Sequence, residues 1–303
     1  MANAHLLNVR LAAKTGDDLK RLFDRLGNTS HPRGFVTSAY RTLLSSLSAG
    51  VIDSPTAALD LFRSTRYGLE SGLRSTLADS ADLGAEQAAK ELDAWGLVVP
   101  AYDAEGLPLI RNATETILSA YDQQANAAYT MIESGDIDRA EILGDETRVG
   151  LLTVAPVLLA ATRWIVTAQA YAQSDRTEQT LERNGQSVSQ YGLQAIAAID
   201  DKTTDCCLKV HGQIIPVNGK FHLTGTPRFA DDMAAPPFHW NCRTATALVK
   251  LDEQDDDLTR ILQAAAQTEI EARRDGVQDV PKTTNAGSAR PSRVNRLRQI
   301  IRN

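Results

Sequence analysis

The residues best suited to chemistry in this 303-residue chain gather in one stretch, from Asp200 to Arg243. All three cysteines of the chain lie in it, together with three of its five histidines: Cys206, Cys207, Cys242, His211, His222 and His239. Cysteine sulfur and histidine nitrogen are the usual ligands of structural zinc, and ligands from one turn commonly meet ligands from a distant loop. The stretch is therefore predicted to be a small module tied by a metal ion or by cross-links.

The candidate metal ligands come from two parts of this stretch. They are Cys207, His211, His239 and Cys242, with Cys206 as an alternative to its neighbour. Gly212 permits a tight turn after His211, and the pair Pro236-Pro237 stiffens the approach to His239. A zinc ribbon has two C-x-x-C knuckles, and this stretch has neither, so spacing alone does not establish a metal site.

Three interpretations of the cluster stay open. Structural zinc fits the ligand types and the reducing compartment expected for a chain whose amino terminus lacks the features of a secretory signal. A buried cluster without metal, able to form a Cys207–Cys242 disulfide after release from the cell, requires only packing and is the default. A catalytic Cys–His pair would need a positioning group and an oxyanion site that the sequence does not indicate.

Composition excludes several broad classes. A hydrophobic fraction of 43% and a charged fraction of 23% are typical of a globular protein with a real core. The formal charge of -6 argues against a generally basic nucleic-acid binder. The most apolar run, 151–161, is too short to span a bilayer, so no membrane partner is expected. The common nucleotide, dinucleotide, metalloprotease and serine-hydrolase motifs are absent.

Helical periodicity dominates the chain around the module. Helices are predicted for 17–26, 54–77, 113–135, 138–149, 157–173, 187–199 and 252–276. Pro156 predicts a kink or a break, because proline lacks the amide hydrogen and clashes with the preceding turn. The segment 96–108, with two prolines and two glycines, predicts an extended loop or a hairpin. The fold class is therefore α+β, predominantly α-helical, with a small β-containing Cys/His module in the C-terminal third.

The last 23 residues, 281–303, form a basic segment. They contain six basic residues and no acidic one: Lys282, Arg290, Arg293, Arg296, Arg298 and Arg302. A linker rich in Thr, Asn, Gly and Ser precedes the arginines, so we predict a flexible tail that binds an anionic partner.

A series of residues within and before the module follows a recognisable order. They are Thr177, Glu178, Asp200, Thr203, Cys207, Gly212, Pro236, Pro237, His239, Cys242 and Arg243. In order and spacing they resemble the phage head-morphogenesis family, the phage Mu F-like minor head proteins, over roughly 162–249. The family's final cysteine is Thr244 here, which leaves a metal site one thiol short, and Cys206 is an addition to the pattern.

The resemblance implies a low-copy minor capsid protein of a tailed phage. It would associate with the portal inside the head, aid procapsid assembly and DNA packaging or ejection, and perform no catalysis. The implied partners are the portal protein, the major capsid or scaffold protein, and packaged DNA through the basic tail. The implied location is the interior of the virion head, and the host cytoplasm during assembly. Asp200, Thr203, Gly212, Pro236, Pro237 and Arg243 would be structural motif residues.

Two other functional classes are weighed beside it. One is a zinc- or thiol-dependent hydrolase acting in the phage head, either a nuclease or a maturation protease. The other is a host-directed effector, since the family's module also occurs fused to toxin domains, but too little chain follows Val249 to form one. The expected domains are a helical region (1–135), the head-morphogenesis domain (136–250), a C-terminal helix (251–280) and the basic flexible tail (281–303).

Overall fold

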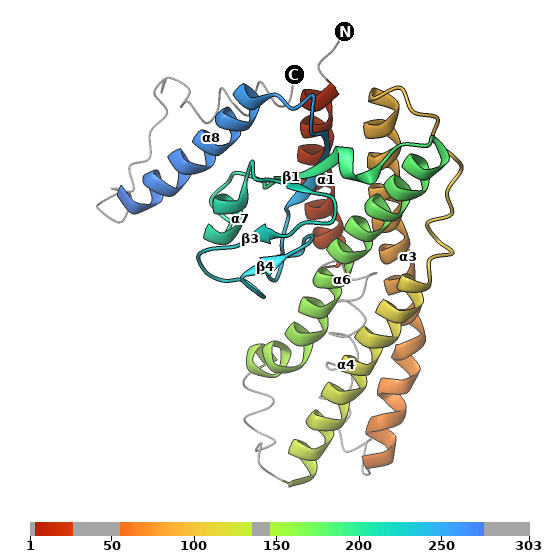
Figure 1. Cartoon of the computed structure of the whole chain (residues 1–303). Coiled ribbons are helices and arrows are strands. Elements are labelled where there is room, and N and C mark those ends of the chain that lie inside the picture. Colours follow the sequence, from red (N-terminus) through yellow and green to blue (C-terminus); the bar gives the residue numbers. More distant parts are fainter. Residues whose placement is uncertain (1–3, 27–54, 135–145, 276–303) are drawn as a thin grey trace, which may run out of the picture. The chain divides into compact units, whose positions relative to one another are not determined.

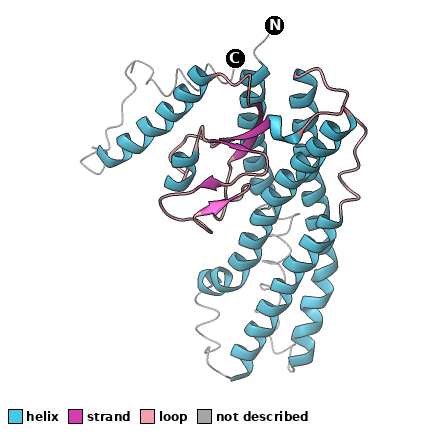
Figure 2. Cartoon of the chain, viewed as in Figure 1, coloured by secondary structure: helices cyan, strands magenta, loops and turns pink. Residues whose placement is uncertain are grey.

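The computed structural model describes residues 4–26, 55–134 and 146–275 (Figure 1). Of the residues described, 63% are helical and 9% lie in strands, so the predicted mixed α+β fold, mostly helical, is confirmed. Figure 2 shows the strands gathered in one place. The predicted basic tail and its five arginines, Arg290, Arg293, Arg296, Arg298 and Arg302, lie outside the described residues. No helix in the described ranges is long and apolar enough to cross a membrane.

The contacts within the chain define two compact units. We call the first the module unit, which comprises Met1–Asp18, Leu83–Tyr102 and Ala170–Asn303. The second, the helical unit, comprises Leu19–Asp82 and Asp103–Gln169. Both units are discontinuous in sequence, because three of the helices contribute residues to each of them. The four consecutive domains expected from the sequence remain a prediction.

The helical unit is built from parts of long helices. They are α1 (Ala4–Leu26), α3 (Pro55–Ala94), α4 (Pro108–Ser134) and α6 (Glu146–Arg183). Leu69, Leu73 and Leu77 recur every four residues on α3 and are buried, as the periodicity predicts. Ser80 donates a hydrogen bond of 2.7 Å to the carbonyl oxygen of Ile165, which joins α3 to α6. The helical unit is thus an apolar bundle with a few polar cross-links.

Several predicted helix boundaries are confirmed, and one interruption is not. The first helix ends at Leu26, α3 begins at Pro55, and α4 ends at Ser134, next to the predicted terminating glycine. Of the kink or break predicted at Pro156, the break is wrong, since α6 runs through this residue. A proline removes one hydrogen bond of the helix ladder, and a helix of 38 residues keeps the others. The segment between α3 and α4 is a loop, as predicted.

A three-stranded antiparallel sheet forms the centre of the module unit. Its order is β2 (Ile214–Pro216), β1 (Tyr191–Ile196) and β5 (Ala245–Lys250). The predicted helix over 187–199 is therefore wrong: a 3-10 turn, Val188–Gln190, leads into β1. Five of the six β1 residues are buried, so the strand lacks the alternation that distinguishes half-buried strands from helices. Gly192 fits the pairing, because a Cβ there would lie 2.7 Å from the carbonyl oxygen of Ile215.

Helices supply apolar residues to the surroundings of this sheet. Val9 and Ala12 of α1 cluster with Ala245 and Ala247 of β5 and with Leu262 of α8 (Asp256–Asp275). A second cluster joins the ends of α3 and α6 to Tyr191 and Leu248. The predicted C-terminal helix is thus confirmed as α8, and Asp255 begins it by accepting a hydrogen bond of 2.9 Å from the amide of Leu258.

A buried polar network fastens β5 to the two long helices of the module unit. The side-chain amides of Gln87 and Gln173 both donate 2.7 Å hydrogen bonds to the carbonyl oxygen of Thr246. Each amide also donates to one carboxyl oxygen of Glu91, at 2.7 and 3.0 Å. Glu91 is completely buried, and this burial raises its pKa to about 8 despite the hydrogen bonds. The carboxyl group is therefore neutral over most of the physiological pH range.

Candidate metal centre

A short helix and a loop bring the three cysteines together. Cys206 and Cys207 lie in the first turn of α7 (Asp205–Val210), and Cys242 follows His239 in the loop before β5. The loop has a cis peptide between Pro236 and Pro237, the two prolines singled out in the sequence. Between α7 and this loop lie β2 and a small two-stranded sheet of β3 (Phe221–His222) and β4 (Asp232–Met233).

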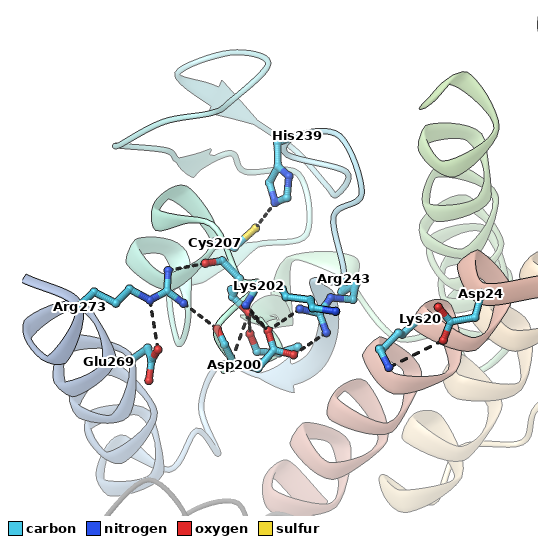
Figure 3. Close-up of polar contacts among 11 residues, drawn as sticks. Lys20, Asp24, Asp200, Lys202, Cys207, His239, Arg243, Glu269 and Arg273 are labelled. Atoms are coloured by element: carbon cyan, nitrogen blue, oxygen red, sulfur yellow. Dashed lines mark hydrogen bonds and ion pairs between the residues drawn. The ribbon is translucent and has the colours of Figure 1, made fainter. Parts of the chain in front are cut away.

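The sulfur and imidazole groups lie within contact distance of one another. The Cys207 Sγ atom is 3.0 Å from the His239 Nε2 atom and 3.8 Å from the Cys242 Sγ atom. The potential donor atoms of Cys206, Cys207 and His239 all lie within 4.8 Å of one another. Figure 3 shows the ring of His239 directed at Cys207. This group could hold a metal ion, with Cys242 beside it.

The orientation of the His239 ring fits metal binding. Its Nδ1 atom faces the carbonyl oxygen of Trp240, so Nδ1 carries the proton and donates it to that oxygen. In the neutral ring, the Nε2 lone pair then points toward the thiols, whereas in the imidazolium form Nε2 carries a proton and donates it to a sulfur. Histidine ligands in metal sites commonly have this arrangement, in which a hydrogen bond from the second nitrogen fixes the tautomer.

The electrostatics of the cluster favour negatively charged sulfur. Burial opposes ionisation of Cys242, but hydrogen bonds from Cys207 and His239 outweigh it and hold the pKa of Cys242 well below its usual value. The neighbouring Cys207 thiol, whose one proton can go to either sulfur, lowers the pKa of Cys206 to about 6, although burial acts against this. Burial also dominates at Cys207 and raises its pKa. Because thiolate is the form of cysteine that binds metals, two of the three sulfurs are prepared for a cation.

His239 acts as the positive partner in this cluster. Burial alone would lower its pKa, but the hydrogen bond with Cys242 and the charge of that thiol raise it. His239 is only 5% exposed and Cys207 only 1%, so a substrate cannot reach either side chain without opening the loop. The arrangement is therefore better suited to holding a small ion than to turning over a substrate.

The structure places one of the predicted metal ligands, His211, away from the sulfur atoms. His211 lies at the C-terminal end of α7, where the backbone leaves the helix, and its Nδ1 accepts a 2.9 Å hydrogen bond from the amide of Ala197. Its ring thus binds the backbone just after β1 and is not part of the sulfur cluster. Burial lowers the pKa of His211 to about 4. Cys206, which the motif does not require, lies in the cluster instead.

The predicted structural residues form a scaffold next to the cluster. The guanidinium of Arg243 donates hydrogen bonds of 2.6 and 2.7 Å to the two carboxyl oxygens of Asp200 (Figure 3). Burial would raise the pKa of Asp200, but Arg243 overrides it and holds the pKa at about 2. Thr203 donates to the Ala198 carbonyl oxygen, which closes the turn before α7. Gly212 has a φ of +80°, a conformation that favours glycine, and it follows His211 as expected.

Sequence reasoning missed one residue of this scaffold. Arg273, near the end of α8, donates a hydrogen bond to the backbone carbonyl oxygen of Thr203. A second one goes to the backbone carbonyl oxygen of Asp200 (Figure 3). In the sequence it reads as a basic residue in the last turn of a helix, where it complements the helix dipole. Only the packing of α7 against α8, through Leu208, Ala266 and Ile270, places it on the turn.

Thr244 occupies the position at which the resemblance leads one to expect a further cysteine. It is buried, and its hydroxyl has no hydrogen-bond partner within the described part of the chain. Comparisons with protein-family models, with curated proteins and with solved structures found no match to this chain.

Proposed function

We propose that the protein is a minor head component of a tailed phage in which the Cys/His cluster is a structural zinc centre. The observation that carries the proposal is the meeting of motif residues that are far apart in sequence. Cys207 contacts His239 and Cys242, 32 and 35 residues away, and Asp200 pairs with Arg243, 43 residues away. Residues that resemble a family motif only by chance would have no reason to form one scaffold.

The donor set supports zinc among the common metals. Cys206, Cys207, Cys242 and His239 offer three sulfurs and one imidazole nitrogen, the composition of many closed zinc sites. Soft thiolate ligands select zinc over magnesium or calcium, which prefer oxygen. Cys206 would supply the thiol that is absent at Thr244. Such an ion would join α7 to the loop before β5 and stabilise the module.

A structural role in the head follows from this arrangement. The module unit is a sheet covered by helices, and its buried cluster presents no reacting group at the surface. A module held together by an ion suits binding to the portal or to the major capsid or scaffold protein. The arginine-rich tail, by its sequence alone, suits contact with packaged DNA or an acidic portal surface.

Two measurements test the proposal. Elemental analysis of purified protein should give one zinc per chain, and Cys242→Ser should reduce it while Ser189→Ala, at an exposed position, should not. Co-purification with the portal protein encoded in the same genome should succeed. If the two proteins associate neither in solution nor in assembled particles, the head role is refuted, whatever the metal content.

A second candidate function rests on one observation. Cys207, His239 and the Trp240 carbonyl oxygen have the order of a nucleophile, a base and a group that orients the base. A thiol-dependent hydrolase in the phage head would use them in this way. Phage carrying Cys207→Ala should then assemble normal particles that fail in one processing step, whereas loss of a structural centre should prevent the particles from assembling.

A further inference from the structure

Two of the three cysteines, Cys207 and Cys242, have their sulfur atoms in contact. The Sγ atoms of Cys207 and Cys242 are 3.8 Å apart, and one side chain comes from a helix and the other from a loop. A disulfide holds its sulfurs about 2.05 Å apart, so this pair must close a gap of less than about 2 Å. A rotation of one side chain or a small movement of the loop is enough.

We propose that Cys207 and Cys242 are a redox-active dithiol that peroxide converts into a single disulfide linking α7 to the loop before β5. The reaction is balanced when two thiols and one hydrogen peroxide give one disulfide and two water molecules. The two sulfurs lose two electrons, and both thiol protons leave in the water. The inference stands on the distance between the sulfurs and holds whether or not the protein is a phage component.

Cys206 makes other contacts that compete with disulfide formation. In its protonated form its Sγ atom donates a hydrogen bond of 2.7 Å to the carbonyl oxygen of Pro227, and it lies 3.3 Å from the Thr204 hydroxyl. A bond to its neighbour Cys207 would join adjacent residues, whose Cα atoms lie about 3.8 Å apart, below the usual 4.4–6.8 Å of disulfides. It would also distort the first turn of α7.

The disulfide and a bound metal exclude each other. If Cys207 and Cys242 are both zinc ligands, oxidation consumes two of the four donors, and the ion should be released. The disulfide would then join α7 to the loop in place of the metal ion. It closes a loop of 35 residues that contains β2, β3 and β4. The module would thus keep a cross-link in both reducing and oxidising surroundings.

Peptide mapping of the full-length protein tests the inference. The reduced protein is treated with hydrogen peroxide, remaining thiols are alkylated, and the protein is digested with trypsin. Cleavage after Lys202, Lys209, Arg228 and Arg243 puts Cys207 and Cys242 on different peptides. We expect the two peptides to be linked, with Cys206 alkylated, and no linkage between separate chains. Relative to the metal-free reduced protein, oxidation should raise Tm by about 5–10 °C.

Matched variants decide which thiols react. Cys206→Ser should form the link as fast as the wild type, whereas Cys242→Ser should form none. A link that contains Cys206, or the absence of any link in the folded wild type, would overturn the inference. The wild-type map suffices if a variant fails to fold. Running the reaction on zinc-free and zinc-loaded protein separates this test from the metal proposal, because the disulfide is expected in both and zinc release only in the second.

Discussion

The side chain of Arg243 holds Asp200 through two parallel hydrogen bonds, one to each carboxyl oxygen. The arginine precedes β5 and the aspartate follows β1, so the pair joins the ends of two neighbouring strands beside the sulfur cluster. Arg243 is one residue from Cys242, which means that the same contact also positions the last thiol. The pair is therefore a structural support for the candidate metal centre.

Replacing Arg243 with lysine should destabilise the protein by about 1–3 kcal/mol, because an ammonium group cannot form both bonds in this geometry. Urea unfolding at pH 7 measures the change. The matched control is Arg228→Lys, at an exposed pair with Asp231, which should change the stability by less than about 0.5 kcal/mol. Equal effects at the two sites would show that the Asp200 pair has no special role.

Acid should weaken the ion pair between Asp200 and Arg243. The folded pKa of Asp200 is about 2 and its ordinary value 3.8, so its contribution to stability is complete above pH 3.8. It is lost as the pH falls from 3.8 through 2, where the carboxylate takes up a proton and the pair with Arg243 breaks. Asp200→Asn should be less stable at pH 7 and should approach the wild type near pH 2. A constant difference between the two proteins at all pH values would contradict this assignment.

Glu91 should give the opposite pH dependence. Its pKa is raised from 4.5 to about 8 by burial, so the folded protein favours the neutral acid. The stability that this group provides is complete below pH 4.5 and declines as the pH rises through 8. Glu91→Gln should remove this decline, and the measurement is the free energy of unfolding from pH 5 to 9. The control is Glu86→Gln on the exposed face of α3, which should leave the decline intact.

Cys206 should contribute to metal affinity although the family motif does not contain it. Cys206→Ser should weaken zinc binding by about 10-fold or more, as measured by competition with a chromogenic chelator. His211→Asn, which keeps a polar side chain outside the cluster, should have less than about a threefold effect. If His211 and not Cys206 proves necessary, the proposed ligand set is wrong.

The sequence predicts helices, whose ends are marked by nearby residues, better than strands, which are defined by pairing with distant segments. Pro55 and the acid-to-base order of residues 252–276 mark helix ends, because caps and dipole effects act within one turn. The strand Tyr191–Ile196 was mistaken for a helix because it is buried on both faces and its apolar residues show no alternation. Its identity depends on pairing with β5, more than 50 residues later, which no local pattern contains.

In the candidate site too, the sequence predicts some residues correctly and misses those whose place depends on packing. Residue types and motif spacing predict that Cys207, His239 and Cys242 lie together, and the structure places them in contact. His211 was assigned by residue type and closeness in sequence, but the end of α7 directs its ring to Ala197. Arg273 could not be found at all, because its role depends on where α8 packs.

The contact of Arg273 with the turn at Thr203 has a consequence for synthesis of the protein. The two residues are 70 positions apart, and the arginine is the later of the two. During translation the cysteines of α7 leave the ribosome well before the guanidinium that closes the turn beneath them. The thiols of α7 are therefore made before the residue that supports their turn, and the proposed metal binding and disulfide formation should be most sensitive to the surroundings in that interval.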